Sequence, residues 1–100
     1  LLALKIKEAR NNWRGLSSTY GNIGILYNTL GNHNQALIYQ KKALKIRKKL
    51  NNRKGMVMSY TDIGAVHYGL KEYSKALQFQ LKGLQLARNV NFGAQVVCFL

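Results

Sequence analysis

The sequence predicts an all-α protein in which antiparallel helix pairs stack side by side as an α-solenoid. The first observation is an internal repeat: residues 20–27 read YGNIGILY, and residues 60–67, forty positions later, read YTDIGAVH. The second is apolar spacing at the helical period between these echoes. The third is the absence of proline, which leaves no linker that would divide the chain. A repeat of this length is typical of helical units that bury their apolar faces against one another.

The elements follow from aligning the chain with itself at the forty-residue offset. The predicted units are residues 1–14 (second helix of a truncated unit), 15–54 and 55–94 (complete units), and 95–100 (start of a further truncated unit). Within the complete units, helices are expected over about 15–30, 33–50, 55–70 and 73–90. Gly31 suits a left-handed helix end, and Asn51, Asn52 and Asn91 fall in the joints between units. The start at Leu1 rather than Met suggests a piece of a longer protein.

The second helix of the first complete unit is predicted to be amphipathic. At about 100° per residue its apolar residues share one arc, and its lysines fall opposite. The apolar arc holds Ala36, Leu37, Tyr39, Gln40, Ala43, Leu44, Ile46 and Leu50, and the opposite face holds Lys41, Lys42, Lys45, Lys48 and Lys49. The first helix of the unit leaves only a narrow polar stripe, so it should lie sandwiched between its partner and the neighbouring unit.

These residues resemble the signature of the tetratricopeptide repeat family, a large residue followed by an apolar-Gly pair, a Tyr, a Gly and two Ala. The matching residues are Tyr20, Ile23, Gly24, Tyr27, Gly31, Ala36 and Ala43, echoed by Tyr60, Ile63, Gly64, His67, Tyr73 and Ala76. The resemblance implies a right-handed solenoid of helix pairs. The forty-residue period is similar to the longer variety found in kinesin light chains and in many bacterial sensor kinases and peptide-responsive regulators.

Glycine inside a helix costs roughly 1 kcal/mol relative to alanine. We therefore expect Gly24 and Gly64 to let the second helix approach closely, with Ala36 and Ala76 facing that approach. The second helices depart from the family pattern because they carry glutamine, at positions 40 and 80, where an aromatic residue is usual.

The resemblance also implies a ligand groove lined by the first helix of each unit. The matching residues are Ser18, Gly21, Asn22, Ile25, Asn28 and Thr29, then Met58, Thr61, Asp62, Ala65 and Tyr68. Gly21 and Ala65 are expected to leave room for bulky ligand side chains. The family's cluster of Lys, Arg and Asn that clamps a terminal carboxylate is not reproduced, so no binding of chaperone tails is expected.

The composition argues against an enzyme. Cys98 is the single cysteine, and the three acids, Glu8, Asp62 and Glu72, form no pair at catalytic or metal-ligand spacing. His33 and His67 align with tyrosines of the other unit, which favours packing roles over metal or acid-base roles. The sequence therefore predicts no catalytic residue, no metal site and no cofactor. No apolar run is long enough to span a membrane, and the low cysteine content favours a cytoplasmic setting.

The charge is lopsided, with 16 Lys and Arg against three acids and a net charge of +13. Half of the basic residues, eight, lie between Lys41 and Lys54, which keeps binding of nucleic acid or another polyanion through the convex face as an alternative. Arg47 falls in the apolar arc, where its charge needs a route to water or a pair with Asp62.

We interpret the chain as a non-catalytic module that binds a protein or peptide in the groove, within a larger bacterial signalling or regulatory protein. Neighbouring repeats or domains of that protein are further expected partners. A purely structural role, through self-association of the open repeat ends, is the other alternative.

Overall fold

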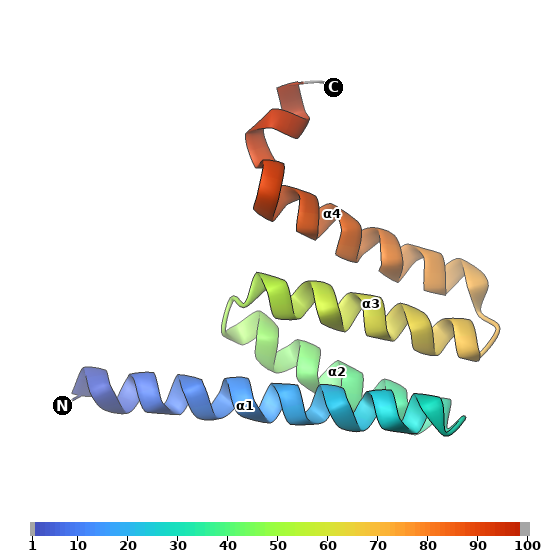
Figure 1. The fold of residues 1–100 in the computed structure, drawn as a ribbon, viewed down its shortest axis with the longest axis horizontal. Coiled ribbons are helices and arrows are strands. Elements are labelled where there is room, and N and C mark those ends of the chain that lie inside the picture. The colour runs from blue at the N-terminus through green and yellow to red at the C-terminus, as the bar shows by residue number, and fades with distance from the viewer. Residues whose placement is uncertain (1, 99–100) are drawn as a thin grey trace.

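The structure is a computed structural model that describes the backbone of residues 2–98 and the side chains of residues 9–88. The described backbone consists of four helices, α1 (Leu2–Thr29), α2 (His33–Lys49), α3 (Arg53–Gly69) and α4 (Tyr73–Cys98). They form two antiparallel pairs, α1 with α2 and α3 with α4, and the pairs join where α2 packs on α3 (Figure 1). The predicted all-α arrangement of helix pairs is therefore confirmed.

Each of the three joints between helices turns on one residue in the left-handed conformation. These residues are Gly31 (φ 84°), Asn51 (φ 54°) and Lys71 (φ 63°). At the first joint the Asn32 N–H donates to the Tyr27 carbonyl at 2.8 Å and the Gly31 N–H to the Asn28 carbonyl at 3.0 Å. The other two joints repeat this pair of bonds at the equivalent positions. All three are Schellman motifs, which satisfy the last carbonyls of the preceding helix.

The joints expected near residues 11–14 and 91–94 are not helix ends. Both α1 and α4 run without interruption through these positions. Asparagine tolerates the left-handed conformation but does not require it, and Asn51 adopts it where α2 and α3 pack on each other. The N-terminal part of α1 instead projects past the end of α2 (Figure 1). The unit boundaries 1–14, 15–54, 55–94 and 95–100 stay predictions of repeat register, and the side chains of 95–100 lie outside the described residues.

The core follows the line where each first helix meets its second helix and the next pair. The part of the chain that the structure describes measures 50 × 42 × 14 Å, so it is thin and any site lies on a helix surface. The buried apolar residues are Ala36, Ala43, Ile46, Ile63, Val66 and Ala76.

A glutamine from each second helix bonds the first helix of its unit, and Gln40 is buried where Gln80 is exposed. Gln40 Nε2 donates to the Gly21 carbonyl at 3.0 Å, and Gln80 Nε2 donates to the Thr61 carbonyl at 3.1 Å. A Cβ on Gly24 would lie 2.7 Å from Gln40 Nε2. A Cβ on Gly64 would similarly lie 2.8 Å from the amide nitrogen of the second glutamine. The helix-interior glycines thus make room chiefly for a glutamine side chain, rather than for the alanines expected to face them.

Candidate functional site

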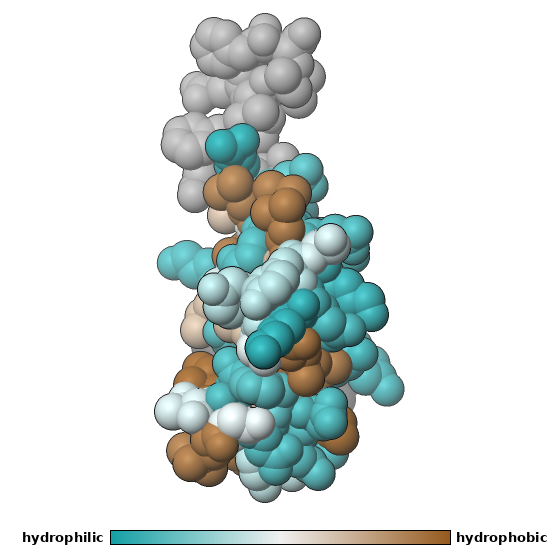
Figure 2. All heavy atoms as spheres, turned by 90° about the vertical axis from the view of Figure 1, so that its right-hand side faces the viewer, coloured by the Kyte–Doolittle hydropathy of each residue, from teal (hydrophilic) through white to brown (hydrophobic). Residues whose placement is uncertain are grey.

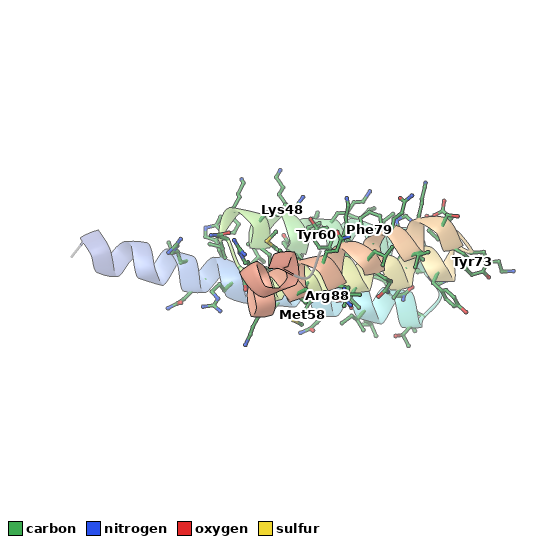
Figure 3. The ribbon with its side chains drawn as sticks, turned by 90° about the horizontal axis from the view of Figure 1, so that it is seen from above. Lys48, Met58, Tyr60, Tyr73, Phe79 and Arg88 are labelled. Atoms are coloured by element: carbon green, nitrogen blue, oxygen red, sulfur yellow. The ribbon has the colours of Figure 1, made fainter. Side chains whose placement is uncertain are left out.

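The two first helices and the lysines of α2 define opposite faces of the molecule. α1 and α3 lie next to each other, although neither is the other's hairpin partner. Seen from above, Met58 of α3 projects from one side, and Lys48 of α2 projects from the other (Figure 3). Side chains of α3 and of the lysine-rich α2 therefore project from opposite sides of the molecule.

A small hollow of about 180 Å³ lies between α1 and α3. It is lined by Ile25, Asn28 and Thr29 of α1, Asp62, Ala65 and Val66 of α3, and Gln40 of α2. It continues into a larger, more open and mostly apolar hollow of about 680 Å³, because Asn28 and Ala65 line both. The rest of the larger hollow is lined by His33, Gly64, Tyr68, Gly69, Tyr73, Ala76, Leu77 and Gln80. The two hollows form one surface, which we call the groove.

The structure brings most of the residues expected to bind a ligand to this groove. Those that line it are Ile25, Asn28, Thr29, Asp62, Ala65 and Tyr68. Ser18, Asn22 and Met58 are exposed one or two turns away and do not line it. The groove residues that were not predicted to bind a ligand come mainly from the second helices, namely His33 and Gln40 of α2 and Tyr73, Ala76, Leu77 and Gln80 of α4. Their signal in the sequence was the repeat register, which aligns His33 with Tyr73 and Gln40 with Gln80.

Gly21 and Thr61 face their own second helices instead of the groove, since their carbonyls accept the glutamine bonds. A Cβ on Gly21 would lie 3.5 Å from the Arg47 guanidinium. The expectation that Gly21 leaves room for a ligand side chain is therefore wrong, because Arg47 occupies that room.

Arg47 is buried at the junction of α1, α2 and α3, where it is 5% exposed. Its Nη1 donates to Ser59 Oγ at 2.8 Å. The expectation that the guanidinium reaches water is therefore wrong, and no ion pair joins it directly to Asp62 among the described side chains. The two charges still interact. Burial lowers the pKa of Arg47, and Asp62 partly offsets that shift.

Asp62 carries the opposite charge at the edge of the groove. Burial raises the pKa of Asp62, and Arg47 partly offsets that shift. A carboxyl group whose pKa is higher in the folded than in the unfolded state binds more protons when folded, so its contribution to stability falls as pH rises through the raised pKa.

We expect the Asp62→Asn variant to gain stability relative to wild type as pH rises from below the ordinary aspartate pKa of 3.8 through the raised value. Above that value the difference should become constant. Urea midpoints measured across this pH range check the prediction. A variant that loses stability relative to wild type as pH rises would show that the Arg47 interaction outweighs burial. Comparing variant with wild type cancels the opposite trend from Glu72, whose pKa is lowered by its hydrogen bond to His67.

Both histidines take part in packing and in hydrogen bonds near helix ends. His67 stacks on Phe79 with ring centroids 5.3 Å apart, at the position where Tyr27 stacks on Tyr39 in the first unit. Its Nδ1 donates to Glu72 Oε1 at 2.9 Å. His33 Nδ1 donates to Asn28 Oδ1 at 2.7 Å. Among the described residues no group of three His, Cys, Asp or Glu side chains is arranged to hold a metal ion.

Several lysines of the outer face lie over aromatic rings. Lys42 Nζ is 5.5 Å from the centroid of Tyr20, and Lys48 and Lys82 each lie 5.9 Å from that of Tyr60. Cation–π contacts of this kind stabilise exposed sites by about 0.5–1 kcal/mol. They give part of the basic face a structural role.

Several exposed apolar side chains gather in the groove, namely Ile25, Tyr68, Tyr73 and Leu77. At the end that carries the α1–α2 and α3–α4 turns, apolar residues form small groups among polar ones (Figure 2). No helix in the described part of the chain is long and apolar enough to cross a membrane.

The family model described as "Tetratricopeptide repeat" matches residues 15–89. No curated protein and no solved structure matches the chain.

Proposed function

Because the chain belongs to the tetratricopeptide repeat family, whose members generally act as protein-interaction modules, we propose that it binds a peptide segment of a partner protein in the groove. The main supporting observation is the groove, formed by the two hollows together, which gathers six residues of the expected ligand surface from two different repeats. Members of this family are typically non-catalytic, and the groove holds a single carboxylate, Asp62.

The groove suits a peptide with both apolar and polar features. Tyr68, Tyr73 and Leu77 supply apolar surface to the larger hollow and are all more than half exposed. Asp62 and the Asn28 amide, whose Oδ1 is already bonded to His33, offer an acceptor and a donor nearby. Together they match an extended peptide that places apolar side chains on tyrosines and its backbone near polar groups.

The setting of the module is part of the same proposal. The resemblance to the longer repeats of bacterial sensor kinases and regulators supports a place within a larger, cytoplasmic signalling protein. In such a protein the groove would engage either a separate partner or a neighbouring domain.

Two isoleucines of nearly equal exposure provide the test. Ile25 lies in the groove and is 47% exposed, and Ile38 lies on α2, away from its buried residues, and is 49% exposed. Peptides would be selected from a random displayed library on the immobilised wild-type chain, and their affinities then measured for the Ile25→Arg and Ile38→Arg variants. We expect Ile25→Arg to weaken binding by about tenfold or more, through steric blocking of the groove, and Ile38→Arg to leave binding unchanged.

Selected peptides that bind Ile25→Arg as well as wild type would contradict the groove. Asn28→Ala is a poorer test, because it also removes the hydrogen bond from His33.

A further inference from the structure

A second hollow, of about 500 Å³, lies where α1 passes the joint between α2 and α3. Arg10 and Arg14 line it from α1, and Arg53 and Lys54 line it from the start of α3. Asn51 and Asn52 complete its polar wall. None of the groove residues lines this hollow, so it is a separate site. We call it the joint hollow.

Among the residues whose side chains the structure describes, no acid balances the positive charge of the joint hollow. The described residues that line it include no Asp or Glu. The ion pairs found among the described side chains both involve Glu72 of α4, and Asp62 is the acid that interacts with Arg47. Four like charges around one concave space repel one another, and a bound anion relieves that repulsion.

The composition of the joint hollow favours phosphate over carboxylate. The protein has eleven lysines and only five arginines, yet three of those arginines line this hollow. Guanidinium groups form paired hydrogen bonds to phosphate oxygens, which an ammonium group does not. Four cations also match the double charge of a phosphate monoester better than the single charge of a carboxylate. Since α3 begins at Arg53, the positive end of its helix dipole adds to the same field.

An apolar hollow of about 530 Å³ adjoins the joint hollow, with Leu50 lining both. Trp13, Tyr20 and Ile46 line its apolar part, and three lysines, Lys42, Lys45 and Lys49, line the rest. An anionic group and an apolar side chain therefore find adjacent sites. We propose that this pair of hollows binds a phosphorylated side chain of a partner peptide, with a neighbouring apolar side chain of the same peptide beside Trp13.

A peptide fits these observations better than a single-stranded nucleic acid. Nucleic-acid sites stack successive bases on successive aromatic rings along a basic track. Here both aromatic residues, Trp13 and Tyr20, line the adjoining hollow and none lines the joint hollow, so the arginines are gathered apart from the rings instead of alternating with them.

The test uses fluorescein-labelled octapeptides that carry a central phosphoserine in an alanine background, with one leucine moved through the other positions. Their unphosphorylated forms and a short oligothymidylate serve as reference probes, and affinity is read by fluorescence anisotropy at physiological ionic strength. We expect phosphorylation to tighten binding by about tenfold or more, and one leucine position to bind best.

The decisive comparison is between a variant that loses two positive charges inside the joint hollow and a variant that loses two positive charges outside it. The double variant Arg10→Gln, Arg14→Gln should abolish the preference for phosphopeptide. Arg14→Lys should weaken it, because lysine keeps the positive charge but cannot form the paired hydrogen bonds of a guanidinium group. Lys41→Gln with Arg88→Gln, which removes two exposed charges that line neither hollow, should keep the preference. Ile25→Arg should also keep the preference for phosphopeptide. This variant therefore distinguishes a failure of the phosphopeptide proposal from a failure of the proposed peptide binding in the groove.

Three results would overturn the proposal. The first is an equal loss of preference in the Lys41 and Arg88 variant, which would show general charge attraction. The second is binding that does not depend on phosphorylation. The third is oligothymidylate binding more tightly than every phosphopeptide, with the same sensitivity to the Arg10 and Arg14 changes, which would assign the site to nucleic acid.

Discussion

Replacing Ile63 by alanine is expected to lower the free energy of unfolding by about 3 kcal/mol, since large-to-small changes at fully buried sites typically cost 2–5 kcal/mol. The Ile63 side chain is 0% exposed because α3 lies between α2 and α4. Deleting the three outer carbons of this side chain leaves a cavity, because α2 and α4 on either side cannot both move in to fill the space. Urea unfolding followed by far-ultraviolet circular dichroism measures the loss.

The repeat supplies the matched control. Ile23 occupies the same position in α1 but is only partly buried, because α1 is packed chiefly against α2 and has no second flanking pair in the described structure. Ile23→Ala should therefore cost about 1 kcal/mol, in proportion to the smaller area removed from contact. Equal losses at the two positions would contradict the account of burial by neighbouring pairs.

Replacing Gly64 by valine is expected to lower the free energy of unfolding by about 2–3 kcal/mol, the upper part of the range of about 1–3 kcal/mol for overpacking a core. Even the first carbon of the new side chain would lie 2.8 Å from Gln80 Nε2 and 3.1 Å from the backbone oxygen of Ala76. The glutamine would have to leave its bond to the Thr61 carbonyl, and the backbone of α4 would have to shift. Thermal unfolding of the variant checks this.

Gly15→Val is the control for the same chemical change within a helix. A Cβ on Gly15 meets nothing within 4 Å, so only intrinsic helix propensity changes, and valine is slightly better than glycine. We expect a stability within about 0.5 kcal/mol of wild type. A large loss at Gly15 as well would mean that valine itself, and not the clash with Gln80, disturbs these helices.

The pairing of helices was predictable because the repeat places the same apolar residues at the same turns. Gly31 was predictable as a helix end for a similar local reason, since glycine has no Cβ to resist a positive φ. Lys71, at the equivalent place in the second unit, gives no such signal and is held in the left-handed conformation by the bonds of its Schellman motif. The sequence did not predict that α1 is uninterrupted, because asparagine at the repeat joint can adopt either the helical or the left-handed conformation.

The groove was only partly predictable, because its shape depends on contacts between helices. The family resemblance identified Ile25, Asp62 and Ala65 as groove residues, and the structure places all three in its lining. Whether a position faces the groove or its own partner helix depends on the crossing of those helices, and this is where the expectation at Gly21 failed. The position of Arg47 on its arc indicated burial, but its bond to Ser59 joins different repeat units and leaves no periodic signal.

The bond from Gln40 to the Gly21 carbonyl also constrains how the sequence can diverge. Glutamine at position 40 and glycine at position 24 accommodate each other, so a change at either site alone leaves a clash or an unfilled space. An aromatic residue, which is more usual in this family, could replace Gln40 only if position 24 changed as well. The same holds for Gln80 and position 64, and the two units would have to change independently. The Gln40 bond therefore links the residue types at positions on two helices of the same unit.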